Sequence, residues 1–297
     1  MKIDAVFSGG GVKAFAYVGV LESLKEHQLQ LVRVAGTSAG AIVGSLVAAG
    51  YEINEIEKLI HELDLTEFID PPLLTRLLPF TKWFFMYSQL GINKGNKLES
   101  WLEELLARKN IRTFHDIKEG YFKVVVSDLS LGRLIVIPDD LESVYGIEAN
   151  YFPVAKAVRM SAGFPFFFMP KKMPGLYKKK SVIVDGGLLS NFPLWIFDNG
   201  DKTKKRPILG IKLTDATEKG IGPRDIKNAL DMYQALFSTM KQAHDARYIS
   251  KNEKRNILFV PVANTGAVNF HISQEVKKEL IRSGKENADD FLKRWST

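Results

Sequence analysis

The chain has 297 residues, 45% of them hydrophobic and 25% charged, with 41 basic and 34 acidic side chains that give a net charge of +7. The composition is ordinary for a globular protein, and the absence of cysteine excludes disulfides, a thiol nucleophile and cysteine-ligated metals. There is no signal-peptide pattern and no stretch near the roughly 18 apolar residues of a membrane-spanning helix, so we expect a cytoplasmic protein.

The N-terminal part of the chain alternates between strand-like and helix-like runs. Residues 3–7 read as a short buried strand, and a helical pattern follows from 13 to 26. A second strand is expected at 31–35 and an apolar helix at 41–49, which Gly50 ends. This alternation indicates βαβ units and therefore a largely parallel sheet.

Residues 66–95 interrupt this alternation with a dense group of apolar and aromatic side chains. Pro71, Pro72 and Pro79 break the segment too often for one long helix, and the segment is too apolar for a plain loop. Two interpretations follow. We favour a cap that packs on the core and lines an acyl pocket over a surface that touches a lipid interface.

The rest of the chain returns to the α/β pattern. Helices are expected at 95–109, at 223–250, where apolar residues form one stripe, and at 273–294. The further expected strands are residues 121–127, 134–137, 182–184, 208–213 and 257–260.

No internal repeat, low-complexity tract or linker divides these elements, although the length alone also permits two domains. We therefore predict a single domain over residues 1–297. It consists of a core at about 3–198, a hydrophobic cap-like insertion at about 66–95 and a C-terminal α/β extension at 199–297.

Much of the excess positive charge gathers in two clusters. The first is Lys171, Lys172, Lys178, Lys179 and Lys180, and the second is Lys202, Lys204, Lys205 and Arg206. Such clusters are either solvated loops or a surface that faces an anionic membrane. We do not expect nucleic acid as a partner.

A Gly-x-Ser-x-Gly pattern places Ser38 between Gly36 and Gly40. In a nucleophile elbow the serine stands on a strained turn between a strand and a helix, so small residues are required on both sides. The apolar strand-like run before the motif and the helix-like run after it supply that context. The alternative is a turn rich in glycine and serine that binds phosphate or no ligand, and the pentapeptide alone does not decide between them.

A glycine-rich loop, Ser8-Gly9-Gly10-Gly11-Val12-Lys13-Ala14, follows the first strand. Its spacing fits a dinucleotide-binding loop, but the acidic residue expected about 20 positions later, at the end of the next strand, is missing. The other role is an oxyanion hole, which we favour. Its N–H donors would come from Gly9, Gly10 and Gly11, and from Ala39 after the serine.

A third motif, Asp185-Gly186-Gly187, follows a strand-like run at 181–184. The two glycines would free the carboxylate to reach the crevice that holds Ser38. The alternative is an ordinary Asp-Gly turn.

A nucleophilic serine needs a base, and this chain has five histidines as candidates. They are His27, His61, His115, His244 and His271. None follows a strand-like run with glycines beside it, so we prefer a Ser38–Asp185 dyad to a triad. The carboxylate would take the serine proton and later return it to the leaving group.

Together these motifs resemble the patatin-like phospholipase family. The resemblance rests on Gly9 to Lys13, Gly36 to Gly40 and Asp185 to Gly187 in this order, with Asn191-x-Pro193 and residues 161–165 as further matches. It covers about residues 3–198. One residue departs from the family pattern, since Ala14 stands where glycine is usual, and we expect activity to survive this change.

The resemblance implies a three-layer α/β/α sandwich with a mostly parallel central sheet, a Ser38–Asp185 dyad and a glycine-loop oxyanion hole. It also implies hydrolysis of lipid acyl esters, as in phospholipases A and lysophospholipases, without metal or cofactor. Two alternatives stay open, an acyltransferase on a similar fold and a non-catalytic module that binds lipid or nucleotide. As partners we expect a lipid substrate and peripheral contact with an anionic membrane surface.

Overall fold

The computed structural model describes residues 1–78, 81–175, 179–197, 206–215, 254–262 and 272–295, together with short runs and single residues between 226 and 245. The strands are β1 (Lys2–Phe7), β2 (Gln30–Thr37), β3 (Gly91–Asn93), β4 (Phe122–Asp128), β5 (Arg133–Ile137), β6 (Phe166–Phe168), β7 (Lys171–Pro174), β8 (Lys180–Asp185), β9 (Ile208–Asp215) and β10 (Ile257–Val262). The helices are α1 (Ala16–Glu26), α2 (Ala39–Ala48), α3 (Ile53–Glu62), α4 (Leu73–Leu77), α5 (Thr81–Gln89), α6 (Asn96–Arg108), α7 (Leu141–Tyr145), α8 (Val154–Ser161) and α10 (Gln274–Leu292).

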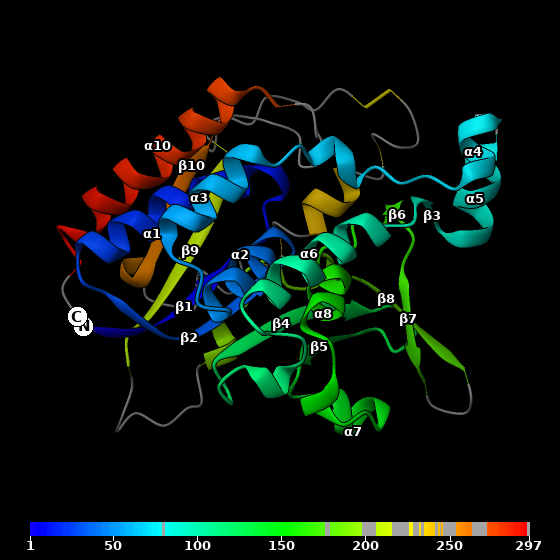
Figure 1. The fold of residues 1–297 in the computed structure, drawn as a ribbon, viewed down its shortest axis with the longest axis horizontal. Coiled ribbons are helices and arrows are strands. Elements are labelled where there is room, and N and C mark those ends of the chain that lie inside the picture. The colour runs from blue at the N-terminus through cyan, green and yellow to red at the C-terminus, as the bar shows by residue number, and fades with distance from the viewer. Residues whose placement is uncertain are drawn as a thin grey trace.

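Eight strands form the central sheet, in the order β10-β9-β1-β2-β4-β8-β7, with β5 paired to β4 beside this path (Figure 1). Neighbours from β10 to β4 run parallel. The pairs β4–β5, β4–β8 and β7–β8 are antiparallel. The α/β fold with a mostly parallel central sheet, expected from the βαβ pattern and the family resemblance, is confirmed.

Strand β4 brings two distant parts of the chain together. On one of its two edges it pairs with β5 along residues 124–128. On the other edge, β4 pairs with two strands in turn. The last residue of β2, Thr37, lies opposite Val125, and the last residue of β8, Asp185, lies opposite the next residue of β4, Val126. The carboxyl ends of β2 and β8 therefore meet head to head on adjacent residues of β4.

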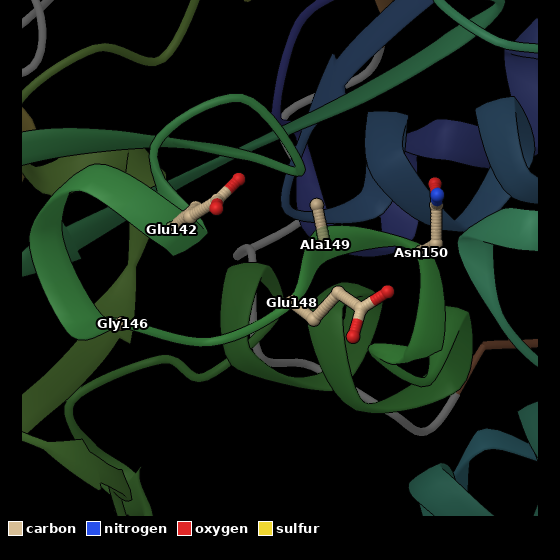
Figure 2. A pocket seen from close by; sticks show the side chains of 5 residues that line it. All are labelled: Glu142, Gly146, Glu148, Ala149 and Asn150. Carbon is tan, nitrogen blue, oxygen red and sulfur yellow. The ribbon is translucent and has the colours of Figure 1, made fainter.

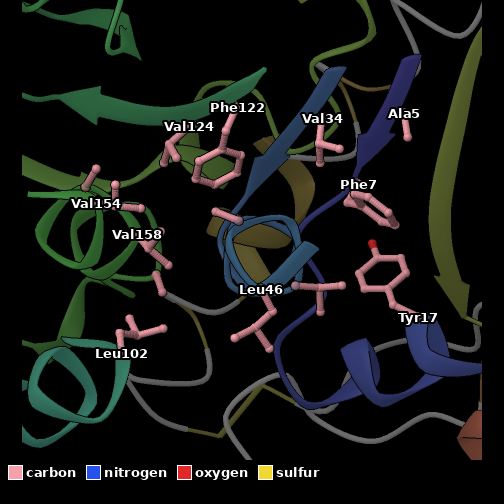
Figure 3. Close-up of a cluster of buried hydrophobic side chains, with 14 of the residues drawn as sticks. Ala5, Phe7, Tyr17, Val34, Leu46, Leu102, Phe122, Val124, Val154 and Val158 are labelled. Carbon is pink, nitrogen blue, oxygen red and sulfur yellow. The ribbon is translucent and has the colours of Figure 1, made fainter. Parts of the chain in front are cut away.

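The two faces of the sheet bury different side chains, because successive strand residues point to opposite sides. Ala5, Phe7, Val34 and Val124 point toward the helices, where they pack with side chains such as Leu46 of α2 (Figure 3). The alternate strand residues pack against residues of the short 3₁₀ helix η7 (Leu194–Phe197) on the other face. The helix-covered side thus carries the larger of the two hydrophobic clusters in the described part of the chain.

Some local elements differ from the sequence-based expectation. The helix expected from residue 13 begins as a 3₁₀ helix, η1 (Gly11–Phe15), whose first residue, Gly11, has a left-handed backbone conformation with φ of 56°. Strand β7 was not expected, since Lys-Lys-Met-Pro lacks a clear alternation of apolar and polar residues. Helix α8 was not expected either.

Several predicted features fall on residues that the structure does not describe. Most of the helix expected at 223–250 lies outside the described residues, and so do four lysines of the basic clusters: Lys178, Lys202, Lys204 and Lys205. Arg206, the last residue of the second cluster, is described, and its Nε donates to the buried Asp4 at 3.1 Å.

The insertion at 66–95 has a packed base and an exposed tip. At the base, Phe68 is buried and contacts Trp101 edge-on, and β3 pairs with β6. Helices α4 and α5 project from the body at the end opposite α1 and α10 (Figure 1), and their apolar side chains are largely exposed. A cap packed closely on the core, the interpretation that the sequence favoured, does not describe this tip. No helix within the described ranges has the length and apolar character needed to cross a bilayer.

Candidate active site

Ser38 lies at the sharp turn between β2 and α2. Its backbone has φ of 55° and ψ of −125°, a left-handed conformation that is strained for a residue with a Cβ. A Cβ on Gly36 would lie 2.4 Å from the carbonyl oxygen of Gly40, and a Cβ on Gly40 would lie 2.5 Å from that of Phe7. Both glycines of the motif are therefore required by close backbone contacts, as a nucleophile elbow demands.

Asp185 is the hydrogen-bond partner of this serine. The Ser38 Oγ donates to Asp185 Oδ2 at 2.7 Å, although the two residues are 147 positions apart. The other carboxylate oxygen, Oδ1, accepts from the Gly187 N–H at 2.7 Å, and the aspartate is almost fully buried. The Gly187 amide thus orients the carboxylate so that Oδ2 faces the serine hydroxyl, at the point where the ends of β2 and β8 meet on β4.

Ser161, the last residue of α8, holds the other side of the elbow. The Ser38 N–H donates to Ser161 Oγ at 2.8 Å, and that hydroxyl donates in turn to the Val125 carbonyl at 2.6 Å. From the sequence, Ser161 was identified only as the first residue of the segment 161–165, which resembles the family, and no role was assigned to it. Its contact with the nucleophile depends on how α8 packs against β4, and the sequence does not state this.

The glycine loop lies against the same turn. A Cβ on Gly9 would lie 3.1 Å from Ser38 Cβ, so a larger residue there would crowd the nucleophile. The Gly9 N–H donates to the Asn191 carbonyl at 3.0 Å. Of the predicted oxyanion donors, the amide of Gly9 is therefore engaged in holding the loop. Gly10 and Gly11 stand at the start of η1, and Ala39 is the first residue of α2, where helical amides have no partner within the helix.

Asn191 connects the glycine loop with the aspartate turn. Its Oδ1 lies 2.4 Å from where a Cβ on Gly9 would be and 3.2 Å from the corresponding point at Gly187. Its Nδ2 donates to Asp245 Oδ2 at 3.4 Å, and Lys212 pairs with the same carboxylate oxygen at 3.1 Å. Asp245 is 2% exposed. Asn191 stands out in the sequence as part of the Asn191-x-Pro193 match, but no pattern points to Asp245, which lies 54 positions further along the chain.

The remaining motif residues support the loop and the turns. A Cβ on Gly186 would lie 2.2 Å from the Val125 carbonyl oxygen, so the aspartate turn also needs glycine. Lys13 is half-buried within η1, and its N–H donates to the Gly10 carbonyl at 3.3 Å. Ala14 lies in η1 without a left-handed backbone and packs on the core, which explains how alanine is accommodated there.

None of the described histidines is the hydrogen-bond partner of Ser38 Oγ. His27 Nδ1 lies 2.9 Å from the Ser23 carbonyl, and His61 Nδ1 lies 3.2 Å from Gln274 Oε1. His115 belongs to a short 3₁₀ turn at residues 114–116. His244 and His271 lie outside the described residues. Within the described part, Ser38 Oγ therefore bonds a carboxylate, as the sequence predicts.

Arg159 is a buried cation two residues before the end of α8. Its side chain donates to the carbonyls of Gly95, Lys94 and Met169 at 2.8, 3.0 and 3.1 Å, and its guanidinium lies 4.6 Å from the centre of the Phe168 ring. Burial lowers the pKa of Arg159 to about 10. The arginine ties the base of the 66–95 insertion to α8, a link that the sequence did not indicate.

A separate hollow lies between α7 and the short 3₁₀ helix η4 (Ala149–Tyr151), with a volume of about 520 Å³ (Figure 2). Its lining is Glu142, Gly146, Glu148, Ala149 and Asn150. It contains none of the residues that the sequence analysis singled out. Its two carboxylates would repel the negative charge that develops in ester hydrolysis, so the chemistry is better sought at Ser38.

Comparisons with known proteins find relatives of this chain. Protein YqhO of Bacillus subtilis (strain 168) is 44% identical to this chain over 296 residues, 100% of both chains. A cUMP-AMP-activated phospholipase of Escherichia coli is 26% identical over 195 residues, which are 62% of this chain and 54% of that protein, so the chain spans about half of its length. The crystal structure of VipD from Legionella pneumophila matches the fold with a TM-score of 0.58 at 17% identity, over 99% of this chain and 67% of that one.

The family assignment rests on the part of the chain that holds these motifs. A family model described as patatin-like phospholipase matches residues 5–198, which include the glycine loop, the Ser38 elbow and the Asp185 turn. This range is well over half of the 297 residues. The chain belongs to the patatin-like phospholipase family.

Proposed function

We propose that this protein is a serine acyl hydrolase that cleaves the ester bonds of lipids through an acyl-enzyme at Ser38. Lipid acyl hydrolysis in general is supported by the family and by the phospholipase among the relatives. The observation that carries the specific proposal is the 2.7 Å hydrogen bond from Ser38 Oγ to Asp185 Oδ2. It joins a nucleophile on a strained elbow to a buried base, which is the arrangement that nucleophilic catalysis requires.

In the first half of the reaction, Ser38 Oγ attacks the ester carbonyl carbon while Asp185 Oδ2 accepts the hydroxyl proton. The negative charge then passes to the carbonyl oxygen, where the N–H groups of Gly10, Gly11 and Ala39 stabilise it. When the tetrahedral intermediate collapses, the bond to the alcohol oxygen breaks and the proton on Asp185 passes to that oxygen. The acyl group remains on Ser38.

In the second half, water replaces the alcohol. Asp185 takes a proton from the attacking water, and the same amides stabilise the second oxyanion. Collapse breaks the acyl bond to Ser38 Oγ, which regains its proton, and the fatty acid leaves. The hydrogen bond from the Gly187 N–H to Asp185 Oδ1 keeps Oδ2 in position through both halves.

A covalent probe tests this proposal directly. A fluorophosphonate reacts with serines that are activated as nucleophiles, and peptide mapping identifies the labelled residue. We expect labelling at Ser38, prevented by Asp185→Asn, together with hydrolysis of a phospholipid by the unmodified protein. If the probe labels no serine, or labels one other than Ser38, the proposed nucleophile is wrong.

A further inference from the structure

The segment from Leu73 to Leu90, which contains α4 and α5, carries an unusual amount of exposed apolar surface. Half of the large hydrophobic side chains that are exposed in the described part of the chain lie in this segment. They are Leu73, Leu74, Leu77, Leu78, Trp83, Phe84, Tyr87 and Leu90. Large contiguous apolar surfaces of this kind mark sites that bind another molecule.

The exposed side chains lie on one face of each helix. In α4, Leu73, Leu74 and Leu77 follow the spacing of a single helical face, and in α5 so do Trp83, Phe84 and Tyr87. Tyr87 is 89% exposed and Trp83 is 73% exposed. Tryptophan and tyrosine join a large apolar ring to a polar group, which suits them to the boundary between water and lipid.

Every charged residue between Asp70 and Glu99 in the sequence is basic. These residues are Arg76, Lys82, Lys94 and Lys97. Lys94 and Lys97 are exposed at the base of the segment. An anionic bilayer attracts such a group of cations, whereas a second copy of the same surface would bring like charges together.

The first lysine cluster adds to this positive end of the molecule. Strand β3, at the base of the segment, pairs with β6, and the chain leads from β6 directly into β7. Lys172, Lys179 and Lys180 are exposed on β7 and β8 or directly before β8. The β7–β8 pair and the α4–α5 segment both lie at the end of the molecule opposite α1 and α10 (Figure 1).

The base of the segment is firmly connected to the candidate active site. The Asp70 carboxylate accepts from the N–H groups of Gly95, Asn96 and Lys97 at 2.6, 2.7 and 3.2 Å, which ties the two ends of the segment together. Arg159 of α8 binds the Lys94 and Gly95 carbonyls, and two residues later α8 ends at Ser161, the partner of the Ser38 amide. One helix therefore contacts both regions.

From these observations we propose that the α4–α5 segment is a docking surface for an anionic phospholipid bilayer. Its leucines and aromatic side chains enter the boundary between headgroups and acyl chains, while the lysines around its base contact the anionic headgroups. Through α8 the docked segment fixes the orientation of the Ser38 elbow toward the membrane. The inference rests on the proposed function, since a membrane surface would supply the lipid substrate. Membrane binding can nevertheless be measured in a variant that hydrolyses no lipid.

The test uses the full chain with Ser38→Ala, so that no hydrolysis alters the vesicles. We expect co-sedimentation with vesicles of phosphatidylcholine and phosphatidylglycerol, weak binding to phosphatidylcholine alone, and weaker binding at about 1 M salt, where the Debye length is about 3 Å. Brominated lipid should quench Trp83, since the other tryptophans are half-buried. Adding Leu77→Ser, Trp83→Ser and Tyr87→Ser together should weaken binding by about tenfold or more.

A matched control uses exposed apolar residues elsewhere, Leu129→Ser, Leu131→Ser and Tyr151→Ser together, which should bind vesicles as the parent does. Both variants should show the circular dichroism and melting temperature of the parent. Equal binding by the two variants, or no binding by the parent to anionic vesicles, would overturn the proposal. The proposal would also be overturned if sedimentation velocity showed that the parent is a dimer and that only the variant with substitutions in α4 and α5 is a monomer. The proposed function is tested separately, by measuring hydrolysis of a short water-soluble ester by the protein that retains Ser38.

Discussion

The junction of β2, β4 and β8 and the α4–α5 segment are opposite in construction. At the junction, glycine turns bring backbones within contact distance, and Ser38, Asp185 and Ser161 are held by hydrogen bonds shorter than 3 Å. In the α4–α5 segment, large side chains such as Tyr87 and Trp83 point into solvent. The first region has a geometry that tolerates little change. For the proposed membrane docking, the second would need only to keep an apolar surface with basic residues around it.

The largest expected effect of substitution lies at the dyad. Ser38→Ala removes the nucleophile and Asp185→Asn removes the base, so each should lower kcat/KM by about a thousandfold or more, equivalent to about 4 kcal/mol. Hydrolysis of a p-nitrophenyl ester measures this loss. As a control, Tyr151→Phe changes an exposed side chain outside the site and should leave the rate unchanged. A dyad variant with more than about a tenth of the parental rate would exclude that residue from the proposed mechanism.

The second effect is on folding. Gly40→Ala places a Cβ 2.5 Å from the Phe7 carbonyl oxygen, so a strand or a helix must move. We expect the free energy of unfolding to fall by about 3 kcal/mol, which urea titration measures.

Gly120→Ala separates crowding from backbone strain. Gly120 has φ of 69°, and no atom lies within 4 Å of the position that an alanine methyl group would take. The substitution therefore meets only the left-handed strain, which costs about 1 kcal/mol. Equal losses at both glycines would mean that close packing of the elbow is not what requires Gly40.

The third effect is on the position of the nucleophile. Ser161→Ala removes the acceptor of the Ser38 N–H and leaves that amide without its partner. The elbow should lose its fixed orientation, so we expect kcat to fall by about tenfold to a hundredfold with little change in KM. Ser161→Thr keeps the hydroxyl and should restore most of the rate. A purely structural role would instead lower the melting temperature of both variants and leave kcat intact.

Much of the junction was predictable because its chemistry depends on short local patterns. The elbow and the glycine loop each follow a strand within a few residues, and Asp185 stands out because two glycines follow it. What the sequence did not reveal comes from long-range packing. Asp245 contacts Asn191 from 54 positions further along the chain, and Arg159 is buried through contacts with carbonyls from two separate loops.

The α4–α5 segment shows the opposite limit. Its composition predicts an apolar element. The residues alone are consistent with both interpretations, a packed cap and a lipid-facing surface. The hydrophobicity of a side chain does not indicate whether it packs against the protein core or against another molecule. The exposure of the apolar side chains of α4 and α5 does not fit a closely packed cap at this tip, and the lipid-facing surface remains a proposal.

The smallest expected effect concerns the one departure from the family pattern. Ala14 lies in η1 without a left-handed backbone and packs on the core, so its methyl group neither strains the loop nor displaces Gly10 and Gly11. Ala14→Gly should therefore change kcat/KM by less than about tenfold, or roughly 1.4 kcal/mol. A larger change, measured with the same p-nitrophenyl ester, would mean that residue 14 sets the position of the oxyanion donors. The junction would then tolerate even smaller changes in side-chain size than its hydrogen bonds suggest.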